Sequence, residues 1–253
     1  MKDCEIYSNL RVPCGSRIMV RVDGRKFKNL SRILELEKPY DLDFVKLMAV
    51  SSLDFFTEFS PSFIYTFSDE INILLDSVPF SGRVEKLNSV FASFIAGSFV
   101  QHLNEEHRFR KKLLNSVKSR SVSFDSRLIP LDSQGVVDYL KSRQDEAWSN
   151  CLNGYAYWTL RKEHGKEEAA RILDKKKKHE LHELLFQNNI NIMDLPAWQR
   201  RGVAIYRESV EVKGYNPLKD KKVVTERFKP YTDWDLPVFS DEFFYQKHTG
   251  IIK

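Results

Sequence analysis

Strand-like and helix-like segments alternate through the first half of the chain, and their order limits the folds that it can adopt. Residues 17–23 mix apolar and basic side chains, several of them β-branched, before Gly24. This pattern is typical of a strand that ends in a turn. From residue 42 to residue 59, apolar side chains recur every three or four positions, which is the period of a helix packed on one face.

Four further segments complete this pattern. Residues 63–67 and 71–75 are short strand-like runs, and the polar triplet Ser68-Asp69-Glu70 between them suits a hairpin turn. Residues 83–102 carry a helical stripe of apolar side chains, and residues 122–124 indicate a fourth strand. The predicted order is βαββαβ, the ferredoxin-like arrangement that RNA-recognition modules share with the palm of nucleotide polymerases.

The second half of the chain has a different pattern. Residues 136–141 and 144–160 are followed by a break at Gly165, and helices are expected near residues 166–173 and 175–186. Two strand-like runs at residues 203–206 and 223–228 should form a small β element. We therefore expect an α+β fold, with a palm-like catalytic core over residues 1–131 and a largely helical region over residues 132–253 packed on it.

Composition and charge exclude several classes of protein. With 42% hydrophobic residues, the chain can build a core, which excludes a disordered or collagen-like protein. The longest apolar stretch, residues 90–100, is shorter than the roughly 20 residues that span a bilayer, and the first residues lack a secretory signal. Three cysteines without a metal-ligand pair read as reduced thiols of a cytoplasmic protein.

Two carboxylates are the first candidates for a functional site. In a ferredoxin-like sheet the first and third strands are antiparallel neighbours, so the end of the first lies beside the start of the third. Asp23 and Asp69 occupy these positions, and two like charges there are unfavourable unless cations lie between them. Carboxylate and carbonyl oxygens suit Mg²⁺, and two such ions can support phosphoryl transfer. The alternative is that both aspartates are ordinary turn residues.

Basic residues are the second candidates, because the net charge is only +5 but its distribution is uneven. Residues 105–127 hold seven basic and three acidic side chains, residues 175–178 are four consecutive lysines, and residues 200–201 are two arginines. Such segments can contact phosphates of a nucleic acid. A run of lysines on a helix is equally typical of a solvated surface.

Several strings are more specific than these patterns. Residues 21–27 (Arg-Val-Asp-Gly-Arg-Lys-Phe), 38–41 (Lys-Pro-Tyr-Asp), 65–71 (Tyr-Thr-Phe-Ser-Asp-Glu-Ile) and 124–127 (Phe-Asp-Ser-Arg) resemble the tRNA-His guanylyltransferase family. Residues 148–154 and 195–202 are similar to its archaeal-type members and to tRNA-repair guanylyltransferase-like proteins. The resemblance, which runs from about residue 17 to residue 228, implies 3′-to-5′ addition of nucleotides to the 5′ end of a tRNA.

The resemblance also implies roles for individual residues. Asp23 and Asp69 would be the catalytic carboxylates and would hold two Mg²⁺ together with the Gly24 carbonyl, while Glu70 would support the site. The residues expected to bind nucleotides are Arg25, Lys26, Phe27, Lys38, Asp41, Ser68, Arg83 and Lys86. Those expected to contact RNA are Arg127, Asn150, Lys175, Lys176, Lys177, Lys178, Arg200 and Arg201.

The implied reaction has two main steps. ATP first activates a 5′-monophosphate end, and the 3′-hydroxyl of an incoming GTP or other NTP then attacks the activated phosphate; a 5′-triphosphate end needs no activation. Both steps are phosphoryl transfers, which need cations more than a protein nucleophile. The resemblance further implies a tRNA partner and a homotetramer built from two dimers.

One departure from the family pattern affects the choice of nucleotide. Eukaryotic members carry His-Ile-Asn-Asn-Leu-Tyr-Asn-Thr where residues 148–155 read Trp-Ser-Asn-Cys-Leu-Asn-Gly-Tyr. The loss of most of these side chains favours addition directed by the opposite strand, either to tRNA-His alone or to many 5′-truncated tRNAs. Two alternatives remain open from the sequence: a palm-type nucleotide cyclase and a non-catalytic RNA-recognition-like protein that binds tRNA.

Overall fold

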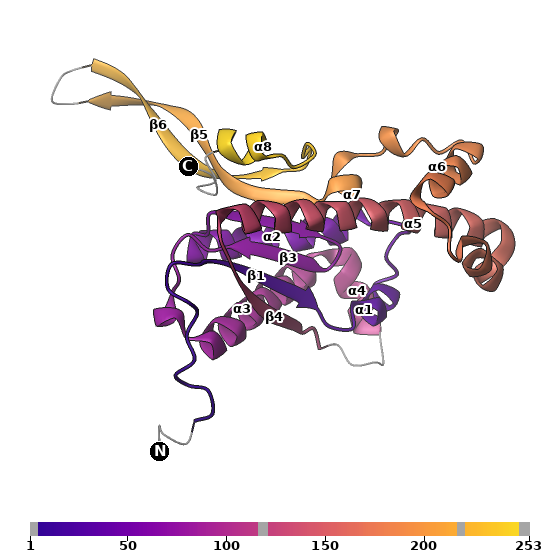
Figure 1. Ribbon diagram of the computed structural model, residues 1–253, viewed down its shortest axis with the longest axis horizontal. Coiled ribbons are helices and arrows are strands. Elements are labelled where there is room, and N and C mark those ends of the chain that lie inside the picture. Colours follow the sequence, from indigo (N-terminus) through magenta and orange to yellow (C-terminus); the bar gives the residue numbers. More distant parts are fainter. Residues whose placement is uncertain (1–4, 116–120, 217–220, 248–253) are drawn as a thin grey trace.

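The computed structural model describes residues 5–115, 121–216 and 221–247, and its centre is one antiparallel sheet (Figure 1). The strand order is β4-β1-β3-β2-β5-β6. The strands are β1 (Arg17–Gly24), β2 (Phe63–Phe67), β3 (Glu70–Leu74), β4 (Phe124–Leu131), β5 (Val203–Asn216) and β6 (Lys221–Asp233). The first four strands and the helices between them have the βαββαβ order of a palm, which confirms the predicted α+β fold.

Helices cover both faces of this sheet. Asp41 begins the helix over Leu42–Phe59, because its carboxylate accepts hydrogen bonds from the backbone N–H groups of Asp43 and Phe44 (3.1 and 3.2 Å). The helices are α1 (Phe27–Ile33), α2 (Leu42–Phe59), α3 (Val84–Glu105), α4 (His107–Asn115), α5 (Ser133–Leu173), α6 (Lys178–Gln187), α7 (Ala197–Arg201) and α8 (Asp241–Gln246).

Alternation along β1 divides the apolar interior into two cores. Ile18, Val20 and Val22 face one core, to which α1, α2, α3 and α4 contribute. Met19 faces the other core, which buries residues of α5 and α8. Because successive side chains of a strand point to opposite faces, the single apolar run of β1 serves both cores. Figure 1 shows α5 crossing the sheet.

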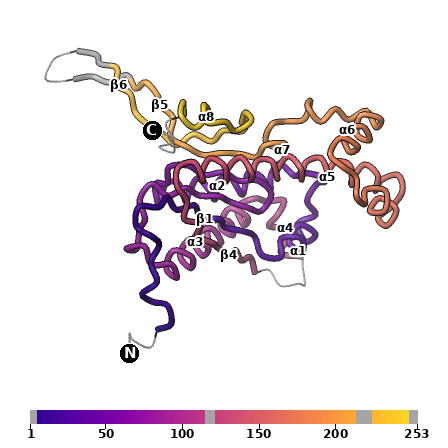
Figure 2. Tube along the Cα trace, in the orientation of Figure 1, coloured from indigo at the N-terminus to yellow at the C-terminus, as the bar shows by residue number. Residues whose placement is uncertain are grey.

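The strands of the second half extend the central sheet. β5 pairs with β2, with Phe63 opposite Tyr206, and β5 and β6 then continue as a long two-stranded arm that projects from the body (Figure 2). The predicted small β element is therefore part of the main sheet. The predicted boundary between residues 131 and 132 stays a prediction, and the sheet contains strands from both sides of it.

One further detail of the structure differs from the sequence prediction, and another agrees with it. β4 begins at Phe124 and runs to Leu131, later and longer than predicted, because its partner β1 pairs with it over its whole length. α5 has the predicted break at Gly165, whose φ of 80° suits a residue without a side chain. Within the described residues, no helix combines the length and the apolar character that crossing a membrane requires.

Candidate active site

The ends of three neighbouring strands bring carboxylates together. Asp23 lies directly opposite Glu70 of β3 and Asp125 of β4. The backbone N–H of Gly24 donates to the carbonyl of Asp69 at 3.0 Å, so Asp69 lies beside the end of β1. Residues directly opposite each other in a sheet share a face, and like charges in that arrangement are destabilising. The strand order thus brings Asp23 and Asp69 together, as the sequence predicted.

The charge of this pair is poorly compensated by the protein. Burial raises the pKa of Asp69, and the nearby charges of Asp23 and Glu70 raise it further, whereas a hydrogen bond from the Ser68 hydroxyl (3.0 Å) acts in the opposite direction. Within the described ranges, Asp23 has no salt bridge or hydrogen bond from a side chain. A pair of half-buried, poorly compensated carboxylates is an environment that a divalent cation would stabilise.

The oxygen atoms at this place fit Mg²⁺. This ion is commonly held by one or two carboxylates and completes its coordination with water and phosphate oxygens. In the described part of the chain, no group of three or more histidine, cysteine, aspartate or glutamate side chains could hold a metal ion. Asp23, Asp69 and the Gly24 carbonyl therefore suit an ion that shares its coordination with a nucleotide.

Packing explains why position 24 is a glycine. A Cβ atom there would lie 2.5–2.7 Å from ring atoms of Phe27, closer than real contacts allow. The Phe27 ring is held in place by three other aromatic rings, those of Phe44, Phe99 and Phe124, at centroid distances of 5.0–6.1 Å. The turn after β1 thus requires a residue without a side chain, because the Phe27 ring fills the space that a Cβ atom would need.

Glu70 is committed to a partner from α5. The Arg143 guanidinium contacts both of its carboxylate oxygens, Nε to Oε1 at 2.8 Å and Nη2 to Oε2 at 2.7 Å. The Asn72 amide donates to Oε1 at 2.9 Å, and the Tyr139 hydroxyl donates to Asn72 Oδ1 at 2.7 Å. This network supports the expected secondary role of Glu70, because its oxygens are already bonded.

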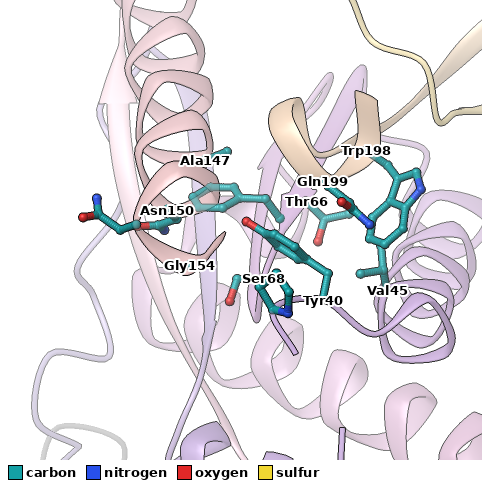
Figure 3. Close-up of a pocket in the computed structure, with 12 residues that line it drawn as sticks. Tyr40, Val45, Thr66, Ser68, Ala147, Asn150, Gly154, Trp198 and Gln199 are labelled. Carbon is teal, nitrogen blue, oxygen red and sulfur yellow. The ribbon is translucent and has the colours of Figure 1, made fainter. Parts of the chain in front are cut away.

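A pocket of about 290 Å³ opens beside Ser68 (Figure 3). Its walls come from the end of β2, the loop before α2, the middle of α5 and helix α7. The lining residues are Pro39, Tyr40, Val45, Thr66, Phe67, Ser68, Ala147, Asn150, Asn153, Gly154, Trp198 and Gln199. The volume is at the lower end of the range for small-molecule sites, about 300–1,000 Å³.

The pocket combines aromatic walls with a few polar groups. The Tyr40 ring lies 6.1 Å from the rings of both Tyr155 and Trp198, and Ser68, Asn150, Asn153 and Gln199 supply hydroxyl and amide groups. Apolar and aromatic walls with a small number of polar groups are typical of sites for small molecules and cofactors.

A buried cysteine lies behind this wall. Burial raises the pKa of Cys151 to about 12, and its thiol is in hydrogen-bond contact with Tyr40. The thiol is therefore protonated at neutral pH and is not a nucleophile. This agrees with a phosphoryl-transfer site that depends on cations rather than on covalent catalysis.

The residues predicted to bind nucleotides divide into those near the pocket and those in the interior. Arg25, Lys26 and Lys38 are exposed and follow the carboxylates or border the pocket. Phe27 is only 6% exposed and belongs to the aromatic cluster. Asp41 is only 4% exposed. Because so little of either side chain is accessible, Phe27 and Asp41 have structural roles in place of the expected contacts with a nucleotide.

Asp41 fastens the loop that borders the pocket. Its Oδ2 atom accepts from Arg108 Nη2 at 2.5 Å and from the backbone N–H of Glu37 at 2.8 Å. Although burial alone would raise it, these bonds and the N–H of Phe44 hold the pKa of Asp41 below its usual range. A carboxylate with all of these partners positions the loop and has little capacity left for a ligand.

Arg83 and Lys86 lie at the start of α3. Arg83 forms a backbone bridge with Arg11, which precedes β1, whereas Asp23 is near the end of that strand. Asn88, two residues after Lys86, accepts a hydrogen bond from the Ser126 hydroxyl at 3.1 Å, and Ser126 lies opposite Val22, the neighbour of Asp23. The expected contact of Arg83 and Lys86 with a triphosphate stays a prediction.

Among the predicted RNA contacts, the arginine pair is used in packing. Arg200 is 8% exposed, and its Nε donates to the Leu195 carbonyl at 2.8 Å. Arg201 Nη1 donates to the Leu236 carbonyl at 2.8 Å. The expected phosphate contact of Arg200 is thus corrected to a structural role, because little of its side chain reaches the surface.

The other predicted RNA contacts are accessible. Arg127 is exposed, with an ion pair to Asp125 at 3.2 Å, and Asn150 borders the pocket. The lysines at residues 175–178 lie between α5 and α6, where Lys176 is 3.9 Å from Glu180. Their contact with RNA stays a prediction.

Several residues of the site were not among the predicted ones. Tyr40, Trp198 and Gln199 line the pocket, and they lie inside the strings that carry the family resemblance, so that signal was present. Arg143 contacts Glu70 from a helix 73 residues later in the sequence, and nothing local to either residue indicates the pair.

Comparison with known proteins shows which family the chain belongs to. A family model described as tRNAHis guanylyltransferase matches residues 1–132, and one described as Thg1 C terminal domain matches residues 134–234. The tRNA(His) guanylyltransferase of Saccharomyces cerevisiae is 30% identical over 76% of this chain and 82% of that protein. The tRNA(His) guanylyltransferase 1 of Arabidopsis thaliana is 32% identical over 83% of this chain, but this covers only 37% of that longer protein.

Solved structures with a similar fold come from the same group of proteins. A bacterial tRNA(His) guanylyltransferase-like protein, solved in complex with ATP, superposes with a TM-score of 0.74 at 23% identity, over 98% of this chain and 96% of that chain. The matches of the two family models together extend over nearly the whole chain, on both sides of the carboxylates and the pocket. This chain therefore belongs to the tRNAHis guanylyltransferase family and is a nucleotidyltransferase.

Proposed function

We propose that this enzyme adds nucleotides in the 3′-to-5′ direction to the 5′ end of tRNA, with the opposite strand as template. Guanosine addition to tRNA-His and repair of 5′-truncated tRNAs are both included. The observation that carries the proposal is the pair of uncompensated carboxylates, Asp23 and Asp69, beside a pocket of about 290 Å³. Family membership disfavours the two alternatives, a nucleotide cyclase and a non-catalytic RNA-binding protein.

Each group of residues in the site would have its own role in the reaction. Asp23, Asp69 and the Gly24 carbonyl would hold two Mg²⁺, which when bound would neutralise phosphate charge and lower the pKa of the attacking hydroxyl. Arg25, Lys26 and Lys38, which are exposed around the carboxylates and the pocket, would orient the phosphates. The aromatic pocket would fix the base of the activating nucleotide, with Ser68 at its edge.

ATP and GTP are the proposed nucleotides of this pocket. The bacterial relative was solved with ATP, and a second structure of such a protein contains GTP. Activation of a 5′-monophosphate end and addition of the next nucleotide would use the carboxylates in turn. Because both steps transfer a phosphoryl group in line, positioning and electrostatic stabilisation supply the catalysis.

A homotetramer made of two dimers is the proposed assembly. Arg83 and Lys86, at the start of α3, are proposed to hold a second triphosphate. The proposed location is the cytoplasm, which is consistent with the free thiols of Cys14 and Cys151.

Transfer of a labelled nucleotide to tRNA tests the function. We expect Mg²⁺-dependent transfer by the unaltered enzyme and loss of at least 100-fold in activity in Asp23→Asn and Asp69→Asn, with tRNA affinity preserved. Asp138→Asn is the matched control, because Asp138 is an exposed aspartate of α5. Full activity in either site variant, or equal loss in the control, would contradict the assignment.

A further inference from the structure

A cation–aromatic cluster lies one helical turn of α5 beyond the pocket. The guanidinium carbon of Arg161 lies 4.6 Å from the centre of the Trp158 ring, and Lys38 Nζ lies 6.0 Å from it. The Tyr157 ring meets Trp158 edge-on at 5.4 Å. We name Lys38, Tyr157, Trp158 and Arg161 the tryptophan platform.

The tryptophan platform continues the wall of the pocket. Gly154 lines the pocket, and Trp158 follows it by four residues on the same helix face, about 6 Å along the axis. On the facing loop, Pro39 lines the pocket and Lys38 precedes it. A ligand that leaves the pocket along α5 therefore meets Trp158 next, with cations on the helix and on the loop.

The charge of the platform suits a polyanion. Residues 151–162 of α5 include no acidic residue, and their only charges are Arg161 and Lys162. Within the ranges that the structure describes, neither Arg161 nor Lys38 forms a salt bridge, whereas Arg171 on the same helix is paired with a glutamate. Arginine beside a half-buried indole is the combination that binds single-stranded nucleic acid, through base stacking and phosphate attraction.

Template-directed addition to a 5′ end requires an unpaired nucleotide on the opposite strand. We propose that the tryptophan platform binds an unpaired 3′-strand nucleotide of the substrate RNA, with its base on Trp158 and its phosphate at Arg161, while Lys38 stays with the phosphates of the nucleotide in the pocket. This inference rests on the proposed function and adds the site for the opposite strand. Unpaired RNA bases commonly stack on aromatic and arginine side chains.

Affinity for two RNA hairpins tests the platform without any chemistry. The hairpins share one stem, and one is blunt while the other carries a single-stranded 3′ extension. We expect Trp158→Ala to weaken binding of the extended hairpin about 5- to 100-fold, the usual loss for one stacked base. Trp158→Phe should keep most of the affinity, and the blunt hairpin should bind all three proteins equally.

The salt dependence of binding separates stacking from charge. Arg161→Gln should reduce the slope of log K against log salt for the extended hairpin by about one phosphate contact. Trp158→Ala should leave that slope unchanged. Arg171→Gln is the matched control, since Arg171 is an exposed arginine of the same helix, 78% exposed and paired with Glu168, and it should change nothing.

Two results would overturn the platform. One is an unaltered affinity of Trp158→Ala for the extended hairpin. The other is weaker binding of ATP alone with no change for RNA, which would place the base of the activating nucleotide on Trp158. Both results are distinct from failure of the proposed function, because that failure would be absence of nucleotide transfer by the unaltered enzyme. Thermal unfolding of Trp158→Phe provides the check that the fold is intact.

Discussion

Among single residues, Asp69 combines a necessary charge with an unfavourable environment. Burial and the neighbouring carboxylates raise its pKa, so the folded protein binds this proton more tightly than the unfolded chain does. The charge then destabilises the fold at neutral pH, and the penalty disappears as the pH falls towards the ordinary aspartate value. Loss of the charge should therefore stabilise the protein while it removes activity.

We expect Asp69→Asn to raise the midpoint of thermal unfolding at pH 7 by about 2–4 °C, the shift that about 1 kcal/mol produces in a chain of this size. The difference should shrink as the pH approaches 4. Mg²⁺ should raise the midpoint of the unaltered protein and leave that of the variant unchanged. Calorimetry over pH and Mg²⁺ concentration measures both effects, and midpoints that coincide throughout would contradict them.

Gly24 tests packing at the same turn. Gly24→Ala places a methyl group within 2.5–2.7 Å of the Phe27 ring, and overpacking of this kind costs about 1–3 kcal/mol. Gly97→Ala in α3 is the control, because nothing lies within 4 Å of its Cβ position, and it should gain about 0.5–1 kcal/mol. Urea unfolding of both variants gives the comparison; equal changes would exclude the Phe27 ring as the cause.

At the scale of elements, one ion pair fastens α5 to β3. Glu70 and Arg143 are 9% and 11% exposed in their side chains. Arg143→Met leaves a buried glutamate without its partner, and such a loss costs about 3–5 kcal/mol. The double variant with Glu70→Gln should recover most of this stability. A double-mutant cycle by denaturant unfolding measures the coupling, and purely additive effects would contradict it.

Elements with local signals were predicted well from the sequence. The bounds of α2 match the prediction because its apolar period lies within the segment and its cap, Asp41, directly precedes it. The bounds of β2 match because a polar triplet follows its apolar run. β4 was misplaced because it begins later than the segment that looked strand-like, and its exposed Asp125 and Arg127 weaken the apolar pattern.

The site was predictable only where strand order determines it. The proximity of Asp23 and Asp69 could be predicted because they lie at adjacent ends of neighbouring strands. The pocket could not, because its walls come from segments more than 100 residues apart, including Tyr40 and Trp198. The grouping of Arg83 with the nucleotide-binding residues came from the resemblance and stays a prediction.

For the molecule as a whole, the structure bears on how a nucleotide is chosen. In the stretch that departs from the eukaryotic pattern, the Trp148 ring packs 5.6 Å from that of His182 on α6, and Cys151 is buried. These side chains hold helices together, which leaves Asn150 and Asn153 at the pocket. Few groups remain to select a base, so pairing with the opposite strand should select it.

We therefore expect guanosine addition to tRNA-His to depend on an opposing cytidine. Replacement of that base by adenosine should reduce guanosine addition at least 10-fold and allow uridine instead. Assays with each labelled NTP on paired tRNA transcripts measure this choice. Efficient guanosine addition opposite adenosine would show that the protein selects the base itself.

The pairing of β2 with β5 decides whether the catalytic half can exist alone. A chain that ended after β4 would keep Asp23 and Asp69, yet β2 would become an open edge with unpaired backbone groups, and Met19 and Phe63 would lose the cover that α5 and α8 provide. Exposed apolar edges of this kind recruit other chains. The half of the chain that holds the carboxylates therefore depends on the other half for its fold. A gene that loses its 3′ half should yield a fragment that aggregates in place of a smaller enzyme.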